Sequence, residues 1–175
     1  GQPYKSVIQE QIWSPLDMTS TAFEPTPEME ERLAIPYAVD PATGRPSATD
    51  RLKADVWPAG IVYGTVLDQA NWLMANLNGG VFRGRQLLRE DLVQEMHTRQ
   101  YDAMKGPISN MWGGDEAGYG LTWWVETRDT GRVFAHSGSV PGYTAFIQGN
   151  LDAGYGVAIL TNGNRAHPHL IRLAD

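Results

Sequence analysis

The sequence contains no cysteine, which excludes disulfides, thiolate zinc sites and cysteine nucleophiles. It has no basic run and a net charge of −6, which argues against nucleic acid as a partner. It also has no apolar run near the length that spans a membrane. The residues present are 42% hydrophobic and 19% charged, and 175 residues suffice for one domain with a core.

The chain also lacks an initiator methionine and a signal peptide. Gly1 falls within a continuing pattern rather than before one. We therefore expect that the chain is either a processed product or a fragment.

The first part of the sequence predicts helices. Apolar residues at helical spacing predict a helix from Pro3 to Trp13, and Pro15 ends it. Thr65 is a predicted N-cap, with Asp68 three residues later in a capping-box-like position. The inward face expected for that helix consists of Val66, Ala70, Leu73, Met74 and Leu77.

Glycines close this helix, and a second helix follows. Asn78-Gly-Gly80 is the expected C-cap. The next helix is predicted from Glu90 to Thr98, with Leu92, Val93 and Met96 facing inward. Residues 100–118 show weak periodicity and are predicted to form a loop.

The last third predicts strands joined by short turns. The expected strands are Tyr119 to Val125, Arg132 to His136, Tyr143 to Gln148 and Tyr155 to Thr161. Short linkers make them an antiparallel meander, and Pro168 to Ala174 is predicted to begin a closing helix. Helices followed by strands indicate an α+β fold, with an antiparallel sheet, flanking helices and a mainly helical layer.

The stretch from Phe134 to Tyr143 joins two of these strands and contains His136-Ser-Gly138. At a strand end, these residues bring together an imidazole, a hydroxyl and an unencumbered N–H, the components of an oxyanion pocket. Pro141 and Gly142 suit a tight turn between the strands. From these residues alone, an ordinary hairpin with a surface histidine is the simpler interpretation.

Four stretches, in order along the chain, resemble the serine β-lactamase and penicillin-binding-protein-like hydrolases, nearest to the class C, esterase and D-aminopeptidase group. They resemble the family segments "PLGM…T", "PAGG…S…D", "GYGLGW" and "HTG…G", at residues 12–21, 58–73, 119–123 and 136–142. The last match extends to the strand that follows it, from Gly156 to Asn162. Asp17 and Ile61 stand where that family carries glycine.

The resemblance also implies two elements that we do not assign to this chain. The family nucleophile lies on a Ser-x-x-Lys turn, and no serine here has lysine three residues later. The second element, Tyr-x-Asn or Tyr-x-Ser, is also expected outside the chain. We therefore expect residues 1–175 to be the C-terminal part of a single β-lactamase-like catalytic domain. Its partner is an N-terminal segment of the same protein that carries both elements.

The resemblance assigns roles to five residues. His136 lies at the polar or anionic end of the substrate, and Ser137 offers a hydroxyl to a substrate carboxylate or carbonyl. Gly138 lets the substrate lie against the strand, and the N–H of Ser139 is one of two oxyanion donors. Tyr63 flanks the Pro58 corner and is either a cleft residue or a core residue.

The implied function is hydrolysis through an acyl-enzyme of an ester, an amide or a β-lactam. His136 stands where the family often has lysine, and histidine is mostly neutral at pH 7. A neutral ester or amide substrate is therefore favoured. This in turn favours an esterase or a peptidase. The substrate is expected to be a small molecule or a short peptide, and the chain alone to be inactive. The alternative is a non-catalytic fragment or interaction module.

We expect neither a cofactor nor a metal. His167-x-His169 has metal-ligand spacing, but no carboxylate or third histidine stands near it in sequence. A periplasmic or secreted location is favoured over a cytoplasmic one.

Overall fold

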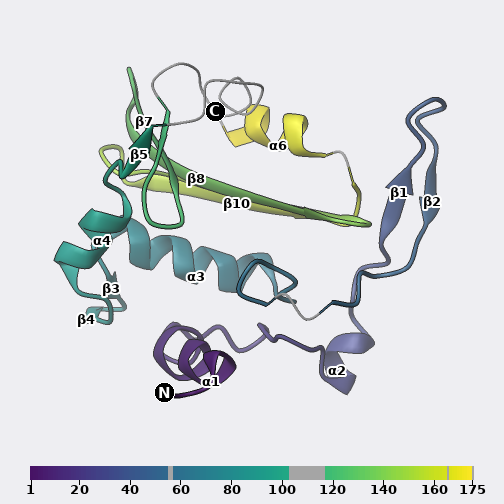
Figure 1. The fold of residues 1–175 in the computed structure, drawn as a ribbon, viewed down its shortest axis with the longest axis horizontal. Helices are drawn as coiled ribbons and strands as arrows, with labels where there is room; N and C mark the ends of the chain where they lie inside the picture. Colours follow the sequence, from purple (N-terminus) through teal and green to yellow (C-terminus); the bar gives the residue numbers. More distant parts are fainter. Residues whose placement is uncertain (55–56, 103–116, 165, 175) are drawn as a thin grey trace.

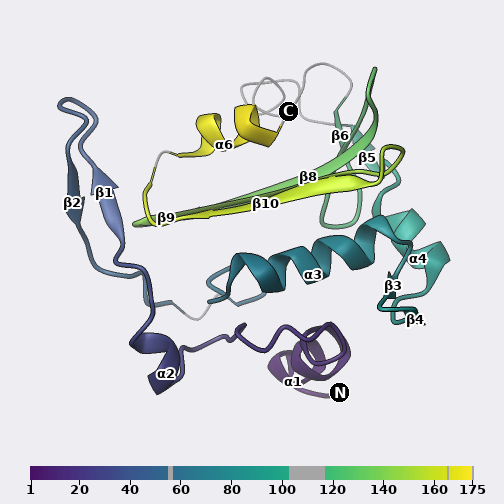
Figure 2. The same ribbon diagram turned by 180° about the vertical axis from the view of Figure 1, so that it is seen from behind.

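The computed structural model describes residues 1–54, 57–102, 117–164 and 166–174, and these residues form layers. A six-stranded antiparallel sheet has the order β10-β9-β8-β7-β6-β5. Helix α6 covers one face, α3 covers the other, and α1 lies beyond α3 (Figures 1 and 2). The expected α+β fold, with its sheet, flanking helices and helical layer, is confirmed.

The sheet is a meander, in which each strand pairs with its neighbour along the chain. The strands are β5 (Tyr101–Asp102), β6 (Gly118–Tyr119), β7 (Trp124–Arg128), β8 (Gly131–Val140), β9 (Tyr143–Asn150) and β10 (Tyr155–Thr161). The region that we expected to be a loop, residues 100–118, therefore contains β5 and the start of β6. Residues 103–116 lie outside the described residues.

Strand β8 does not end at His136 as expected but continues to Val140. Ser137 to Val140 pair in register with the first four residues of β9. The reversal is confined to Pro141 and Gly142, where the glycine has a φ of 81°. His136-Ser-Gly138 is therefore extended backbone inside a strand, because pairing with β9 continues up to the turn.

We expected one strand from Tyr119 to Val125. The structure instead has a bend there, between the end of β6 at Tyr119 and the start of β7 at Trp124. The N–H of Gly120 donates to the carbonyl of Trp123 at 2.8 Å across this bend. A β-carbon at Gly120 would lie 2.2 Å from the carbonyl oxygen of Met96. Close packing against the end of α4 therefore requires glycine here, and the strand pattern is interrupted.

The helices are α1 (Tyr4–Ile8), the π-helix η1 (Gln9–Trp13), α2 (Pro27–Glu30), α3 (Val66–Leu77), α4 (Glu90–Met96) and α6 (His167–Ala174). Two small ribbons complete the fold, β1 (Tyr37–Val39) with β2 (Pro46–Ala48) and β3 (Val81–Phe82) with β4 (Arg85–Gln86). The helix expected from Pro3 to Trp13 is confirmed, with its second half a π-helix. The β1–β2 hairpin projects beside the end of the sheet where β8 turns into β9 (Figure 1).

Helix α3 lies between two clusters of apolar residues. Leu73 packs with Phe134 against the sheet, whereas Ala75 belongs to the cluster in the helical layer. The single inward face that we expected is therefore wrong: Val66 and Met74 are 42% and 43% exposed, and Ala75 is fully buried. A helix covered on two sides buries residues that a single stripe does not include.

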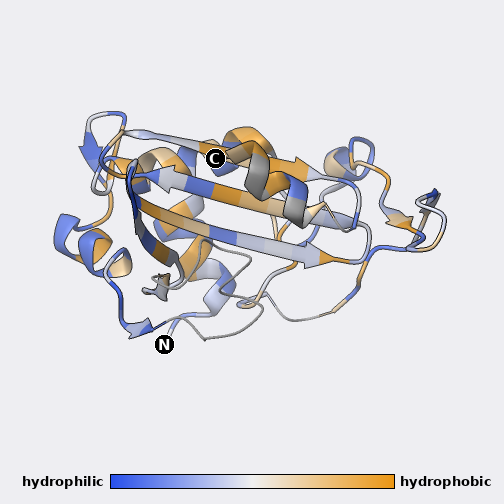
Figure 3. Cartoon of the chain, turned by 90° about the horizontal axis from the view of Figure 1, so that it is seen from above, coloured by the Kyte–Doolittle hydropathy of each residue, from blue (hydrophilic) through white to orange (hydrophobic). Residues whose placement is uncertain are grey.

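The other two helices follow their expected patterns more closely. In α4, Val93 is buried and Met96 packs on the cluster below the sheet, but Leu92 is 46% exposed. On the opposite face, Leu170 and Ala174 of α6 pack in one cluster with Ala135 and Phe146 of the sheet. The view from above shows α6 lying across the strands (Figure 3). Within the described ranges, no helix has the length and apolarity needed to cross a membrane.

Hydrogen bonds join the start of α3 to residues 20–21, which follow η1 in the sequence. The hydroxyl of Thr65 accepts the N–H of Asp68 at 3.2 Å, which confirms the predicted N-cap. The buried carboxylate of Asp68 accepts the N–H of Ser20 at 2.9 Å and the hydroxyl of Thr21 at 2.7 Å. These bonds fix the entrance of the helix relative to residues 20–21.

Candidate active-site edge

The candidate site is an open edge of β8, created because β8 is longer than its neighbour. Strand β7 begins at Trp124, which lies opposite Ala135. Strand β8 continues for five residues beyond that pair, from His136 to Val140, and these pair with β9 alone. In the described part of the chain, no strand occupies the other side of this stretch. We call residues 136–140 the open edge.

Two turns determine which backbone groups face outward. Two-residue turns join Arg128 to Gly131 and Val140 to Tyr143. In such hairpins the two flanking residues are a hydrogen-bonded pair, and bonded and non-bonded pairs then alternate along the ladder. Both turns give the same result: odd-numbered residues of β8 bond toward β7, and even-numbered residues bond toward β9.

A backbone bond at the far end of β8 agrees with this alternation. The carbonyl of Arg132 accepts the N–H of Leu151, which follows β9, at 2.8 Å. The N–H and carbonyl groups of Ser137 and Ser139 therefore point away from β9, out of the open edge. This is the direction that an oxyanion donor at Ser139 requires.

The side chains of the open edge alternate between the two faces of the sheet. Phe134 belongs to the cluster on the α3 side and Ala135 to the cluster on the α6 side. By the period of two, His136 and Gly138 face the α3 side, and Ser137 faces the α6 side. The imidazole and the hydroxyl that the sequence places together are thus on opposite faces.

Gly138 is exposed and has no conformational need for glycine. Its φ is not positive, and a β-carbon there would meet no heavy atom of the described residues within 4 Å. The fold of this chain therefore does not explain the glycine. A group that lies against the strand backbone from outside would explain it.

His136 is half-buried and has a polar partner that the sequence does not indicate. Its Nε2 lies 3.2 Å from the hydroxyl oxygen of Tyr119. Burial lowers the pKa of His136, and the backbone of Ser137 acts weakly in the opposite sense. Burial also raises the pKa of Tyr119. The pair is thus a neutral imidazole beside an un-ionised phenol at neutral pH.

Tyr119 belongs to β6, two strands away from β8 in the sheet. Its side chain reaches His136 past the first residue of β7, Trp124, on whose ring it packs edge-on at 4.9 Å. The sequence places Tyr119 in a strand and in the segment that resembles "GYGLGW", but it assigns this tyrosine no role at the site. No local signal identifies it, because the contact depends on where β7 begins.

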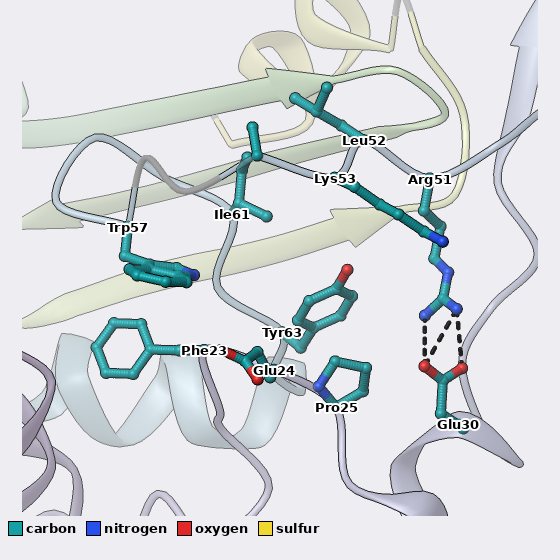
Figure 4. A pocket seen from close by; sticks show the side chains of 11 residues that line it. Phe23, Glu24, Pro25, Glu30, Arg51, Leu52, Lys53, Trp57, Ile61 and Tyr63 are labelled. Atoms are coloured by element: carbon teal, nitrogen blue, oxygen red, sulfur yellow. Dashed lines mark hydrogen bonds and ion pairs between the residues drawn. The ribbon is translucent and has the colours of Figure 1, made fainter.

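Tyr63 lies in a different place, in a cavity of about 440 Å³ lined by residues within 23–30, 51–54 and 57–63 (Figure 4). Two backbone hydrogen bonds of 2.9 Å pair Tyr63 with Ala22. Tyr63 thus lines a cavity, and His136 is not among the residues that line it, so the expected contact of Tyr63 with the substrate stays a prediction.

A Tyr-x-Ser match lies near the start of the chain. Tyr4-Lys5-Ser6 does have the Tyr-x-Ser spacing that we expected to be absent. These residues lie in α1, with α3 between α1 and the sheet (Figure 1). The match therefore contributes nothing to the open edge. Among the described residues, no three histidine or acidic side chains gather as a metal site would require.

Comparison with known proteins identifies the family. A family model described as Beta-lactamase matches residues 1–174. Protein flp of Staphylococcus aureus (strain N315) is 25% identical over 173 residues, which cover 97% of this chain and 31% of that protein. The human protein named Putative beta-lactamase-like 1 is 34% identical over 95 residues, or 53% of this chain and 17% of that protein.

Two solved structures share the fold. The octameric penicillin-binding protein homologue from Pyrococcus abyssi has a TM-score of 0.73 at 24% identity, covering 97% of this chain and 37% of that one. A D-stereospecific amidohydrolase from Streptomyces sp. has a TM-score of 0.65 at 20% identity, covering 94% and 45%. The chain thus spans less than half the length of each relative. Because the family model matches residues 1–174, the chain belongs to the Beta-lactamase family.

Proposed function

We propose that residues 1–175 are the C-terminal part of the catalytic domain of a serine hydrolase. It acts through an acyl-enzyme on an ester, an amide or a β-lactam, and an ester or peptide substrate is favoured. The serine nucleophile and its lysine belong to an N-terminal segment of the same polypeptide. Family membership supports this proposal, as does the share of 17–45% that the chain covers in the relatives named above.

The observation that carries the proposal is the outward direction of the Ser139 N–H at the open edge. When a serine hydroxyl attacks a carbonyl carbon, the carbonyl oxygen gains negative charge. A backbone N–H held in a sheet stabilises that charge without reorganising, because β9 already fixes the strand. The outward N–H and carbonyl of Ser137 lie two residues away, where they suit an extended substrate.

His136 supports a substrate that is uncharged at the ester or amide group near this imidazole. Burial lowers the pKa of this imidazole, so it is uncharged at neutral pH. A neutral ring beside the Tyr119 hydroxyl offers a hydrogen bond rather than a fixed charge. In this proposal, His136, Ser137 and Gly138 contact the substrate, and Tyr63 contacts a more distant part of it.

Replacing Ser139 tests the oxyanion role in the complete polypeptide. Ser139→Pro removes the N–H, and the sheet loses no hydrogen bond because this N–H faces the open edge. Ser139→Ala is the matched control, because it removes the hydroxyl and keeps the N–H. With an activated ester as substrate, we expect kcat to fall about 10²- to 10³-fold in the proline variant.

The alanine variant is expected to retain most of its activity, and both variants to melt close to the parent temperature. Equal activity of the two variants would show that the Ser139 N–H stabilises no charge. A large drop in melting temperature for Ser139→Pro alone would mean that this N–H bonds within the fold.

A further inference from the structure

The cavity that contains Tyr63 has two chemically different ends (Figure 4). Trp57 and Phe23 lie at one end, with ring centroids 6.3 Å apart in an edge-on arrangement. Arg51, Glu30 and Lys53 lie at the other end, and Tyr63 stands between the two. A volume of about 440 Å³ is within the range of small-molecule sites. The cavity therefore suits a ligand with one apolar and one polar end.

The aromatic end is held in place before any ligand arrives. The Nζ of Lys5 lies 3.3 Å from the ring centroid of Trp57 and 2.7 Å from a carboxylate oxygen of Glu24. Phe23 packs on Trp13 with a centroid separation of 4.4 Å. Such pre-organised aromatic walls bind an apolar group without first ordering side chains.

The charged end has an excess of positive charge. Arg51 donates to both carboxylate oxygens of Glu30, at distances from 2.9 to 3.1 Å. Glu24 is neutralised by Lys5. Both acidic groups of the lining are therefore paired, whereas Lys53 is exposed and has no ion pair or hydrogen bond in the described part of the chain. The unmatched group at this end is a cation, which selects an anion.

This charged end borders the turn that closes the open edge. Tyr143 follows that turn, and its hydroxyl donates to the carbonyl of Ala34 at 2.6 Å. Gly142 in that turn packs against the segment that leads to Arg51, because a β-carbon there would lie 3.1 Å from the side chain of Thr49. The cavity thus lies near a substrate that reacts beside Ser139.

We propose that the cavity binds an apolar, preferably aromatic, group that carries a carboxylate, with the carboxylate at Lys53. The group is the part of the substrate that flanks the reacting carbonyl. That second statement rests on the proposed function, whereas the ligand class rests on the cavity alone.

The ligand class is tested with 3-phenylpropanoate and its neutral analogue 3-phenylpropanol, titrated into the complete polypeptide by calorimetry. We expect the acid to bind about five- to tenfold more tightly than the alcohol, because only the acid pairs with Lys53. Lys53→Met keeps most of the apolar stem and should remove this difference while leaving the affinity for the alcohol unchanged. Arg85→Met, at an exposed cation on β4, is the matched control and should change neither affinity.

Equal affinity for acid and alcohol, or a preference that survives Lys53→Met, would overturn the inference. Absence of binding by both probes would overturn it as well. A competition assay then links the cavity to the reaction: the acid should inhibit ester hydrolysis competitively, and Lys53→Met should raise its inhibition constant about five- to tenfold.

Different results would contradict the proposed function and the proposed ligand class. Binding without any ester hydrolysis would remove the proposed function and leave the ligand class in place. Hydrolysis that depends on Ser139, without selective binding of the acid, would remove the ligand class alone.

Discussion

Tyr119 lies on β6, two strands away from β8, and its hydroxyl oxygen lies 3.2 Å from Nε2 of His136. A half-buried histidine with a polar partner is restricted in its ring orientation. If His136 contacts the substrate, Tyr119 acts on the reaction through His136 and is a positioning residue.

A double-mutant cycle tests that relation. We expect Tyr119→Phe and His136→Ala each to lower kcat/KM of the complete polypeptide, the first by severalfold. In the double variant, Tyr119→Phe should have no further effect, because its only route to the substrate has gone. Additive losses would show that Tyr119 acts independently of His136. Melting curves on the same variants separate the catalytic effect from a stability loss of about 1 kcal/mol for the lost hydrogen bond.

His97 is a second half-buried histidine, and it stacks on Phe134 with centroids 4.2 Å apart. Its Nε2 has no hydrogen-bond partner among the described residues. Burial lowers the pKa of His97 to about 4, and the charge of Arg132 adds to this effect. The folded state therefore favours the neutral imidazole.

This histidine should make stability depend on pH. Between pH 6.5 and 4 the unfolded chain binds a proton at His97 that the folded chain does not. The neutral imidazole contributes its full share of the free energy of unfolding above pH 6.5, the unfolded pKa. That share is lost as the pH falls toward 4, by about 3 kcal/mol in total. Urea unfolding at pH 7 and pH 4.5 measures it. We expect His97→Leu to reduce the difference between the two pH values, and an unchanged difference would exclude this residue as its source.

At the scale of local elements, two turns have a residue with positive φ that is not glycine. Asp17 and Ile61, which stand where the resembling family carries glycine, have φ values of 53° and 60°. Positive φ is unfavourable for residues with a β-carbon, and most unfavourable for β-branched ones. The turn geometry is thus imposed by the surrounding structure, which at Ile61 includes the pairing of Tyr63 with Ala22.

Glycine at the second turn should therefore stabilise the protein. Ile61→Gly relieves roughly 1–2 kcal/mol of backbone strain, part of which is offset by the greater freedom of glycine in the unfolded chain. We expect a net gain of about 0.5–1 kcal/mol in the free energy of unfolding, read from urea denaturation. Val62→Gly is the control, because Val62 is exposed and its φ is not positive, and it should destabilise. A loss of stability in Ile61→Gly would mean that the side chain contributes more than its strain costs.

At the scale of the whole molecule, the chain has a scaffold and an open edge but no Ser-x-x-Lys. The 175-residue chain by itself should therefore not hydrolyse activated esters or β-lactams above background, because oxyanion donors without a nucleophile leave only a small residual effect. The complete polypeptide, assayed at the same concentration, is the comparison.

Either of two results would change this view. Stoichiometric acylation of the 175-residue chain by a serine-reactive probe would reveal a nucleophile within it. A complete polypeptide without a Ser-x-x-Lys segment, and without activity, would favour the alternative of a non-catalytic interaction module.

Local patterns in the sequence determined much of the fold. Thr65 begins α3 and the glycines after Asn78 end it, because caps depend on bonds within one turn of helix. The strands β9 and β10 lie within one or two residues of their expected ends, because β-branched and aromatic runs are bounded by turn residues. The motifs also determined the family, since their order along the chain is a property of sequence alone.

The candidate site was decided by the tertiary structure. The open edge exists because β7 starts opposite Ala135 while β8 continues to Val140, and a difference between the lengths of two paired strands leaves no local signal. The same pairing directs the Ser139 N–H outward and brings Tyr119 to His136. Backbone direction and cross-sheet contacts depend on register between segments far apart in sequence, whereas capping and periodicity depend on neighbours along the chain.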